Sequence, residues 1–256
     1  MRIIRYQTAS QPATFGWVKD DKIGTIKGSP FSQFSRAKAD ILLEDVDLLP
    51  PVVPSKIICV GRNYAAHAAE HDAEVPEMPL IFLKPPSTVI PHGGTIFLPP
   101  QSQQVEHEGE LAVVIGKTGR WIAAEEANDH IFGFTIANDV SARDLQFQDG
   151  QWTRGKGFDT FCPLGPWIET DFDPADAVVT CHVNEEMRQM ASTRDMVFNV
   201  RQLVAFASSV MTLYPGDLIL TGTPAGVNTL QDGDVVNVSI EGIGKLNSKV
   251  ANEPAH

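Results

Sequence analysis

Cysteine is scarce in this chain of 256 residues, which contains only Cys59, Cys162 and Cys181. Their number is odd and they lie far apart, so they provide neither a disulfide framework nor the closely spaced pairs of a zinc-binding motif. Cys162, beside Phe161 and Pro163, is more typical of core packing than of a nucleophile. We therefore expect a cytoplasmic protein without disulfides.

Basic residues are few relative to acidic ones. The chain has 20 lysines and arginines against 32 aspartates and glutamates, and its formal net charge is −12. Nucleic acids and anionic membrane surfaces repel such a chain. We therefore expect neither a nucleic-acid nor a membrane partner.

Long apolar runs and nucleotide-binding motifs are missing as well. No run of about 18 apolar residues is present, so we expect no transmembrane helix. The first residues, MRIIRYQTASQ, lack the apolar core of a secretory signal. Neither a G-x-x-x-x-G-K-S/T phosphate loop nor a G-x-G-x-x-G after a strand occurs, which disfavours nucleotide binding.

The patterns that the sequence does contain predict mostly β-strands. Short strands are predicted at 2–6, 14–18 and 23–26, so residues 1–49 form a small β domain. Pro50, Pro51 and Pro54 make residues 50–54 a stiff linker. The remainder, 55–256, carries strand patterns at 57–60, 80–84, 95–98, 109–116, 133–139, 177–183, 217–222 and 234–240.

Helices are few. An Ala-rich helix is predicted at 64–71, and apolar spacing predicts a longer one from Val200 to Thr212. With so few helices between strands, a parallel doubly wound sheet is disfavoured. The pattern indicates a β-rich α+β fold.

Three glutamates open one of the buried strands. In VEHEGELAVVIG (105–116), Glu106, Glu108 and Glu110 stand two residues apart, so on a continuous strand they share a face and repel. Asp139 ends another apolar strand in GFTIANDVSARD, where Ser141-x-x-Asp144 resembles a helix capping box. Two carboxylate-bearing strand ends could converge on one divalent cation. Oxygen ligands favour Mg²⁺, Mn²⁺ or Ca²⁺ over zinc.

His67, Glu70 and His71 share one face of the predicted Ala-rich helix. The spacing matches the H-x-x-E-H pattern of inverted zinc proteases, although no third ligand is evident and the pattern arises easily by chance. A His67–Glu70 pair acting as an oriented general base is the alternative. An exposed polar helix face is a third interpretation.

Two loops complete the candidate chemistry. Lys156 stands between glycines in RGKGFDTFCPLGP (154–166), where it either meets an anionic ligand or belongs to a plain basic loop. LTGTPAGV (220–227) follows a strand, and its backbone N–H groups and hydroxyls could hold a carboxylate.

Six segments in this order closely resemble the fumarylacetoacetate hydrolase family: CVGRNYAAHAAE, PLIFLKPPST, HEGELAVVIG, GFTIANDVSARDLQ, GKGFDTFCPLGPWI and LTGTPAGV. The resemblance covers about residues 55–245. It implies a mixed β-roll with a small N-terminal β domain, a homodimer, and one Mg²⁺ or Mn²⁺ site in each subunit, with Ca²⁺ as a further option.

The resemblance also implies roles for single residues. It assigns the metal to Glu108, Glu110 and Asp139, without Glu106, and the catalytic roles to His67, Glu70 and Lys156. The family's substrate contacts match Arg62, Tyr64, Lys84, Arg143, Gln146 and Thr223. A further aspartate ligand of the longer eukaryotic enzymes has no clear counterpart.

The implied substrate is a small anionic oxo acid. The implied reaction is metal-dependent hydrolysis of a C–C bond in a 2,4-dioxo acid, which gives a carboxylic acid and pyruvate or a related oxo acid. Isomerase, decarboxylase and oxaloacetate tautomerase activities remain alternatives, because a metal-stabilised enolate is common to all. A non-catalytic metabolite-binding domain is a remote alternative, which intact His67, Glu70 and Lys156 disfavour.

Overall fold

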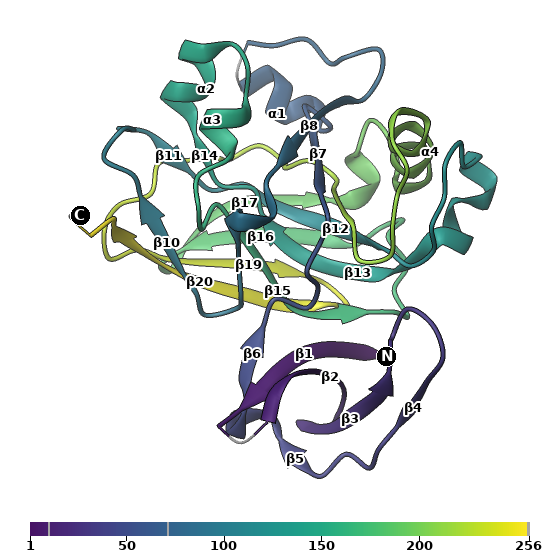
Figure 1. The fold of residues 1–256 in the computed structure, drawn as a ribbon. Coiled ribbons are helices and arrows are strands. Elements are labelled where there is room, and N and C mark those ends of the chain that lie inside the picture. Colours follow the sequence, from purple (N-terminus) through teal and green to yellow (C-terminus); the bar gives the residue numbers. More distant parts are fainter. Residues whose placement is uncertain (10, 71, 255–256) are drawn as a thin grey trace.

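The computed structural model describes residues 1–9, 11–70 and 72–254. Strands dominate the fold and the helices are short (Figure 1). Strand β18 pairs antiparallel with β12 on one side and parallel with β7 on the other, so the sheet is mixed. The predicted β-rich α+β class is confirmed.

The N-terminal residues form an antiparallel meander of β1 (Arg2–Thr8), β2 (Gln11–Lys19) and β3 (Lys22–Gly28). The three predicted strands lie inside these elements. Three short strands follow: β4 (Phe34–Arg36), β5 (Ile41–Leu42) and β6 (Asp47–Leu49). Figure 1 shows β1–β6 as a group set below the rest of the ribbon. The division into 1–49, 50–54 and 55–256 stays a prediction.

One large sheet continues from β1 into the rest of the chain. Its order after β1 is β15 (Cys162–Glu169), β13 (Ile131–Asn138), β12 (Gly109–Ile115), β18 (Leu218–Leu220), β7 (Ile57–Gly61) and β8 (Leu80–Lys84). The short β9 (Val89–Ile90) pairs with β15. All seven residues of β12 are buried. A strand covered on both faces has a nearly continuous apolar sequence, which is why this one was recognisable.

A second sheet has the order β10 (Thr95–Leu98), β20 (Gly244–Asn252), β19 (Val235–Ile240), β16 (Val178–Val183) and β17 (Glu186–Ser192). Burial alternates along β19, so one face of this sheet is turned inward. Val113 and Ile136 of the large sheet share a core cluster with Val179 and Val238 of the second. The two sheets therefore enclose one core, which supports the β-strands that carry the polar site.

The helices lie around the two sheets, and α4 contributes Leu203 and Val204 to the core. α4 (Val200–Val210) begins with a capping box between Asn199 and Gln202 and confirms the predicted helix at 200–212. α1 (Ala65–Glu70), α2 (Arg143–Asp149) and α3 (Thr153–Lys156) gather at one end of the molecule (Figure 1). Single 3₁₀ turns or short runs cover Leu43–Asp45, Pro86–Thr88, Ala124–His130 and Thr193–Asp195.

The predicted capping box at Ser141 and Asp144 is wrong. α2 begins after Ala142 without a side-chain cap. Ser141 belongs to β14 (Ser141–Ala142), which pairs with β11 (Val105–Glu106), and its hydroxyl lies 3.1 Å from Glu108 Oε1. Asp144 instead accepts hydrogen bonds from Ser102 Oγ and the Gln103 N–H. Tertiary partners thus replace the local cap.

In the described ranges, no helix combines the length and the apolar character needed to cross a membrane.

Candidate active site

Glu108, Glu110 and Asp139 converge as the sequence predicts. Glu110 lies at the start of β12, Glu108 just before it, and Asp139 just after the antiparallel neighbour β13. Gly109 pairs with Asn138 in this ladder, which brings the two acidic strand ends together. One carboxylate oxygen from each side chain lies within 4.8 Å of the others, and all three side chains are buried.

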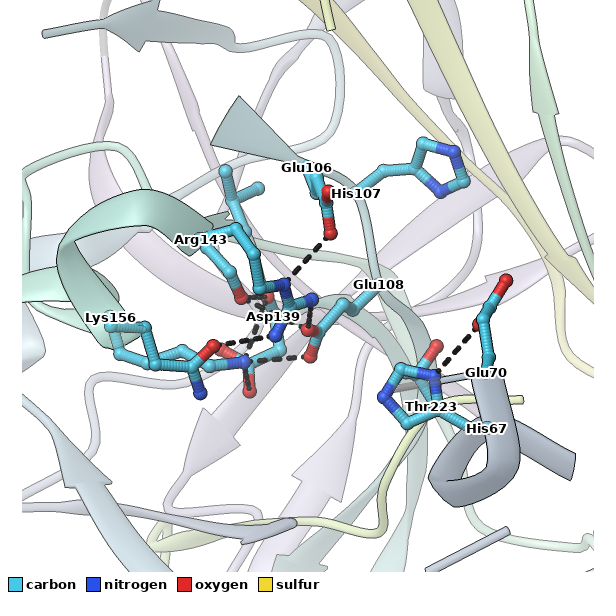
Figure 2. A network of polar contacts seen from close by, with 12 residues as sticks. His67, Glu70, Glu106, His107, Glu108, Asp139, Arg143, Lys156 and Thr223 are labelled. Atoms are coloured by element: carbon cyan, nitrogen blue, oxygen red, sulfur yellow. Dashed lines mark hydrogen bonds and ion pairs between the residues drawn. The ribbon is translucent and has the colours of Figure 1, made fainter. Parts of the chain in front are cut away.

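Glu106 is separated from this group because the strand is interrupted. β11 ends at Glu106 and β12 begins at Gly109, so the alternation expected for a continuous strand is broken. Glu106 instead accepts hydrogen bonds from Arg143 Nε at 2.8 Å and from Gln104 Nε2 at 2.6 Å (Figure 2). Its charge is offset by a cation of the chain rather than by the predicted metal.

Three buried cations face the carboxylates. Lys156 Nζ bridges Glu108 Oε2 at 2.7 Å and Asp139 Oδ2 at 2.9 Å, as Figure 2 shows. Lys84 Nζ lies 2.7 Å from Asp139 Oδ1, and Arg143 contacts Glu108 as well as Glu106. Four carboxylates, counting Glu106, thus meet three cations. With all four carboxylates ionised, the cluster has one negative charge in excess.

The negative charge of the cluster affects the pKa of Glu110 most. Burial raises the pKa of Glu110 well above its usual value, and the charges of Asp139 and Glu108 raise it further. At Glu108 burial also acts to raise the pKa, but Lys156 and Arg143 outweigh it, so its pKa lies well below the usual range. Burial acts to lower the pKa of Lys156, and Asp139 and Glu108 reverse this and raise it. Glu110 is therefore the carboxylate that lacks a compensating charge.

These residues fit a hard divalent cation. The donors are carboxylate oxygens alone, which suits Mg²⁺, Mn²⁺ or Ca²⁺. Asp139 Oδ1 receives no hydrogen bond within the described residues, although the Lys84 ammonium is near. Glu110 Oε2 accepts a hydrogen bond from the Gly222 N–H at 2.7 Å. A cation here would supply the positive charge that the cluster is short of.

His67 and Glu70 meet on α1. His67 Nδ1 lies 3.2 Å from Glu70 Oε2, in keeping with their spacing of three residues (Figure 2). His67 is buried and lines the same cavity as the carboxylates. His71, the last residue of the H-x-x-E-H pattern, lies outside the described residues. Within the described chain, the one group with metal-ligating geometry is the carboxylate triad, and it lacks His67.

The 220–227 loop does hold carboxylates, and they belong to the chain itself. Gly222 donates its N–H to Glu110, and Gly226 donates its N–H to Glu70 Oε1 at 3.0 Å and Oε2 at 3.2 Å. Gly226 has a φ of 102°, and a Cβ there would lie 1.9 Å from the Arg188 carbonyl oxygen. The loop therefore positions one residue from the acidic triad and one from the His67 pair.

A cavity of about 250 Å³ joins these groups. Seven predicted catalytic, metal or substrate residues besides His67 and Lys156 line it: Arg62, Glu108, Glu110, Asp139, Arg143, Gln146 and Thr223. Tyr64, Lys84 and Glu70 are not among the lining residues. Tyr64 and Lys84 are buried, and Lys84 contacts Asp139 without lining the cavity. Another cavity, of about 630 Å³ near the start of α4, contains none of the predicted site residues.

Arg62 enters the cavity wall with an unusual backbone. Its φ is 60°, a left-handed conformation that residues other than glycine rarely adopt. Such strain is found where the surrounding structure requires it, often at ligand sites. Arg62 lines the cavity, and its positive charge suits an anionic ligand.

Gln189 of β17 is a site residue that the sequence does not reveal. It is buried, and it contacts Gly109 between two of the triad residues and Thr223 in the cavity wall. It lies in the segment EEMRQMAS, which resembles an ordinary exposed strand. Only the packing of the second sheet against β12 brings it here.

Residues 56–251 match the family model described as fumarylacetoacetate (FAA) hydrolase C-terminal, and residues 1–51 match one described as Rv2993c-like, N-terminal.

The chain is 48% identical to oxaloacetate tautomerase FAHD2B, mitochondrial, of Bos taurus, over 80% of this chain and 70% of the relative. The solved structure of 5-carboxymethyl-2-hydroxymuconate delta-isomerase from Mycobacterium smegmatis is 45% identical, with a TM-score of 0.92 over 99% of this chain and 100% of that one. Maleylpyruvate hydrolase from Sphingobium sp. SYK-6, solved in complex with manganese(II) ion and pyruvate, is 33% identical, with a TM-score of 0.82 over 99% and 100%.

Proposed function

Because this chain belongs to the fumarylacetoacetate hydrolase family, we propose that it is a divalent-metal-dependent enzyme that forms an enolate from a small 2-oxo acid. The observation that carries the proposal is the position of His67, which Glu70 orients in the cavity that holds the acidic triad. The first reaction we propose is keto–enol tautomerisation or double-bond isomerisation of a 2-oxo dicarboxylic acid. Relatives named for this chemistry are 48% and 45% identical to the chain.

Glu108, Glu110 and Asp139 would hold the cation, which we propose to be Mg²⁺ or Mn²⁺. When bound, it supplies a Lewis acid that draws electron density from adjacent oxygens of an oxo acid. The manganese named for the hydrolase relative supports this choice.

His67 is the group that moves the proton. The Glu70 carboxylate accepts at Nδ1, so Nδ1 carries the hydrogen and Nε2 the lone pair; the tautomer is assigned from this contact. Nε2 takes a proton from the carbon beside the substrate carbonyl and returns it at oxygen or at another carbon. Glu70 stabilises the imidazolium that forms in between.

The cations of the chain offset the charge that develops on the substrate. Lys156 Nζ and the Arg143 guanidinium stand in the cavity wall beside Glu108. Fixed cations in a site closed to water stabilise a developing enolate more strongly than in solution. Arg62 lines the same cavity, and its guanidinium would pair with a substrate carboxylate.

Hydrolysis of a C–C bond in a 2,4-dioxo acid is the second candidate. The hydrolase relative, solved with manganese and pyruvate, supports it. In this reaction His67 would take the proton from water, which attacks the acyl carbonyl, and the products are a carboxylic acid and pyruvate or a related oxo acid.

The test is a product screen by NMR with Mg²⁺ or Mn²⁺ over oxaloacetate, acylpyruvates and unsaturated dioxo acids. Faster exchange between the keto and enol forms of oxaloacetate, without loss of carbon, supports tautomerisation. Release of pyruvate from an acylpyruvate supports hydrolysis. Turnover of none of these compounds would contradict the proposal and favour a non-catalytic binding domain.

A further inference from the structure

Gln189 of β17 uses its whole side-chain amide beside the acidic triad. Its Oε1 accepts the Gly109 N–H at 3.0 Å. Its Nε2 donates to Thr223 Oγ1 at 2.8 Å and to the Pro224 carbonyl oxygen at 2.7 Å. The side chain is buried, and it is not among the residues that line the cavity. A role of Gln189 at the site is therefore exerted through the groups that it holds.

The orientation of this amide is fixed by backbone groups. The Gly109 N–H can only donate and the Pro224 carbonyl can only accept, so a flipped amide would oppose both. The network therefore assigns Oε1 to the Gly109 contact and Nε2 to the Pro224 contact.

Gly109 is held by side chains on the edge of β12 that faces β18. The two strands pair from Ala112 to Val114. At Gly109, Gln189 accepts the backbone N–H, and the Thr223 hydroxyl donates to the backbone carbonyl oxygen at 3.0 Å. Two buried side chains thus take the place of a strand partner at the start of β12.

Gly109 stands between two of the proposed metal ligands, Glu108 and Glu110. The second sheet also packs directly against it, because a Cβ at Gly109 would lie 2.9 Å from Val238 Cγ1 and 3.4 Å from Gln189 Oε1. Contacts this close leave the Gly109 backbone little room to shift. Since the two glutamates flank this backbone, its position governs how their carboxylates converge.

We infer that Gln189 is a positioning residue for the metal, which fixes the Gly109 backbone and so holds Glu108 and Glu110 at a spacing that favours Mg²⁺ or Mn²⁺ over the larger Ca²⁺. The inference rests on the proposed function, which places a divalent cation on the acidic triad. Mg²⁺ requires oxygen ligands at about 2.0–2.1 Å in near-ideal geometry, whereas Ca²⁺ accepts flexible arrangements at about 2.3–2.6 Å. Loosening of the ligand pair therefore weakens Mg²⁺ binding more than Ca²⁺ binding.

The test measures the dissociation constants of Mg²⁺ and Ca²⁺ on the metal-free full-length chain by calorimetry. Gln189→Met keeps a long unbranched side chain but removes both polar atoms of the amide. Mg²⁺ affinity should fall by about tenfold or more, the usual scale when a group that orients metal ligands is removed. Ca²⁺ affinity should fall less, so the dissociation constant of Mg²⁺ divided by that of Ca²⁺ should rise by about threefold or more.

Two further variants isolate the contact with Gly109. Gln189→Glu keeps an oxygen that accepts the Gly109 N–H, and its added charge acts alike on two ions of equal charge. The ratio should therefore stay closer to the wild-type value than in Gln189→Met. Gln189→Asn keeps the amide but is one methylene too short to reach Gly109 and Pro224 together. It should also raise the ratio, and it replaces Gln189→Met if that variant does not fold.

Ser208→Ala is the matched control. The Ser208 hydroxyl is likewise buried between backbone groups, since it accepts the Ile122 N–H at 2.9 Å and donates to the Ala205 carbonyl oxygen at 2.9 Å. Ser208 belongs to α4 and is not among the residues that line the cavity. The variant should lower the melting temperature and leave the ratio at the wild-type value.

The outcomes separate the inference from the function. An unchanged ratio in Gln189→Met, whether both affinities fall or neither does, overturns the inference and leaves the proposed function standing. The same holds if the ratio rises as much in Gln189→Glu or in Ser208→Ala. Wild-type protein that binds neither ion contradicts both the inference and the proposed metal-dependent function.

Discussion

Gly226 donates its backbone N–H to both carboxylate oxygens of Glu70. Glu70 in turn holds His67, so the proposed base is positioned jointly by α1 and by a loop far away in sequence. A side chain at Gly226 would collide with the Arg188 carbonyl oxygen and push the N–H away from Glu70.

Gly226→Ala should therefore lower kcat by about tenfold to a hundredfold, because small displacements of a catalytic group have effects of this size. Mg²⁺ affinity measured by calorimetry should change little. Gly233→Ala is the matched control, since Gly233 also has a positive φ but open space where its Cβ would lie. Equal kcat values for the two variants would contradict the positioning role.

Glu108→Gln should abolish Mg²⁺ and Mn²⁺ binding, whereas Glu106→Gln should leave it largely intact. Both changes remove one buried negative charge at nearly constant shape, but Glu106 pairs with Arg143 and lies outside the group of converging oxygens. Calorimetry with each ion measures the difference. The reverse order of affinities would refute the ligand assignment, and bound zinc that depends on His67 would support the protease interpretation.

Metal binding should release a proton from Glu110 at pH values below its raised pKa. The raised pKa of Glu110 keeps that carboxyl protonated to a higher pH in the metal-free protein, and only the carboxylate form is a metal ligand. Affinity should therefore increase as the pH rises towards the raised pKa and level off above it. Calorimetry in two buffers of different ionisation heat counts the protons. A pH-independent affinity with no proton release would argue against this account.

His67→Ala should lower acylpyruvate hydrolysis or oxaloacetate tautomerisation by about 10²-fold or more, the usual scale for removal of a general base. Decarboxylation of oxaloacetate should suffer less, because it needs chiefly an electron sink and no water activation. Asp139→Ala should remove all of these activities together with the metal site. Unchanged turnover in His67→Ala would exclude the His67–Glu70 pair as the base.

Residues 66–79 are predicted to be a lid that orders over bound ligand. Outside α1, the described part of this segment forms no regular secondary structure before β8 and exposes Val75 and Met78, so it has little apolar material to pack. Hydrogen exchange should become slower there when oxalate binds the Mg²⁺-loaded protein. Equal protection with and without oxalate would mean that the pair is preformed.

The strands that the sequence predicts well are those with continuous apolar stretches, such as β7, β8, β12 and β13. It predicts neither β15 nor β20. β15 contains Pro163, Gly165 and Pro166, which usually interrupt strands, and β20 buries Ser248 between Leu246 and Val250. Both strands are stabilised by pairing with distant segments, for which the local sequence carries no signal.

In the candidate site, too, some features are predicted by the local sequence and others depend on distant segments. The spacing of Glu108 and Glu110, and the match of Asp139 to another strand end, are local features and were recognisable. The removal of Glu106 from the group depends on a break between β11 and β12, and on Arg143 of a different segment. The contact of Gln189 with Thr223 likewise arises only when the two sheets pack.

The convergence of Glu108, Glu110 and Asp139 also bears on the stability of the folded chain. A ligand that binds only the folded state stabilises it by mass action, by about 2.7 kcal/mol at a hundred times its dissociation constant. The melting temperature should therefore rise with the concentration of the cation. If the site binds its cation as proposed, scarcity of divalent ions should leave a larger fraction of the chains unfolded and open to proteolysis.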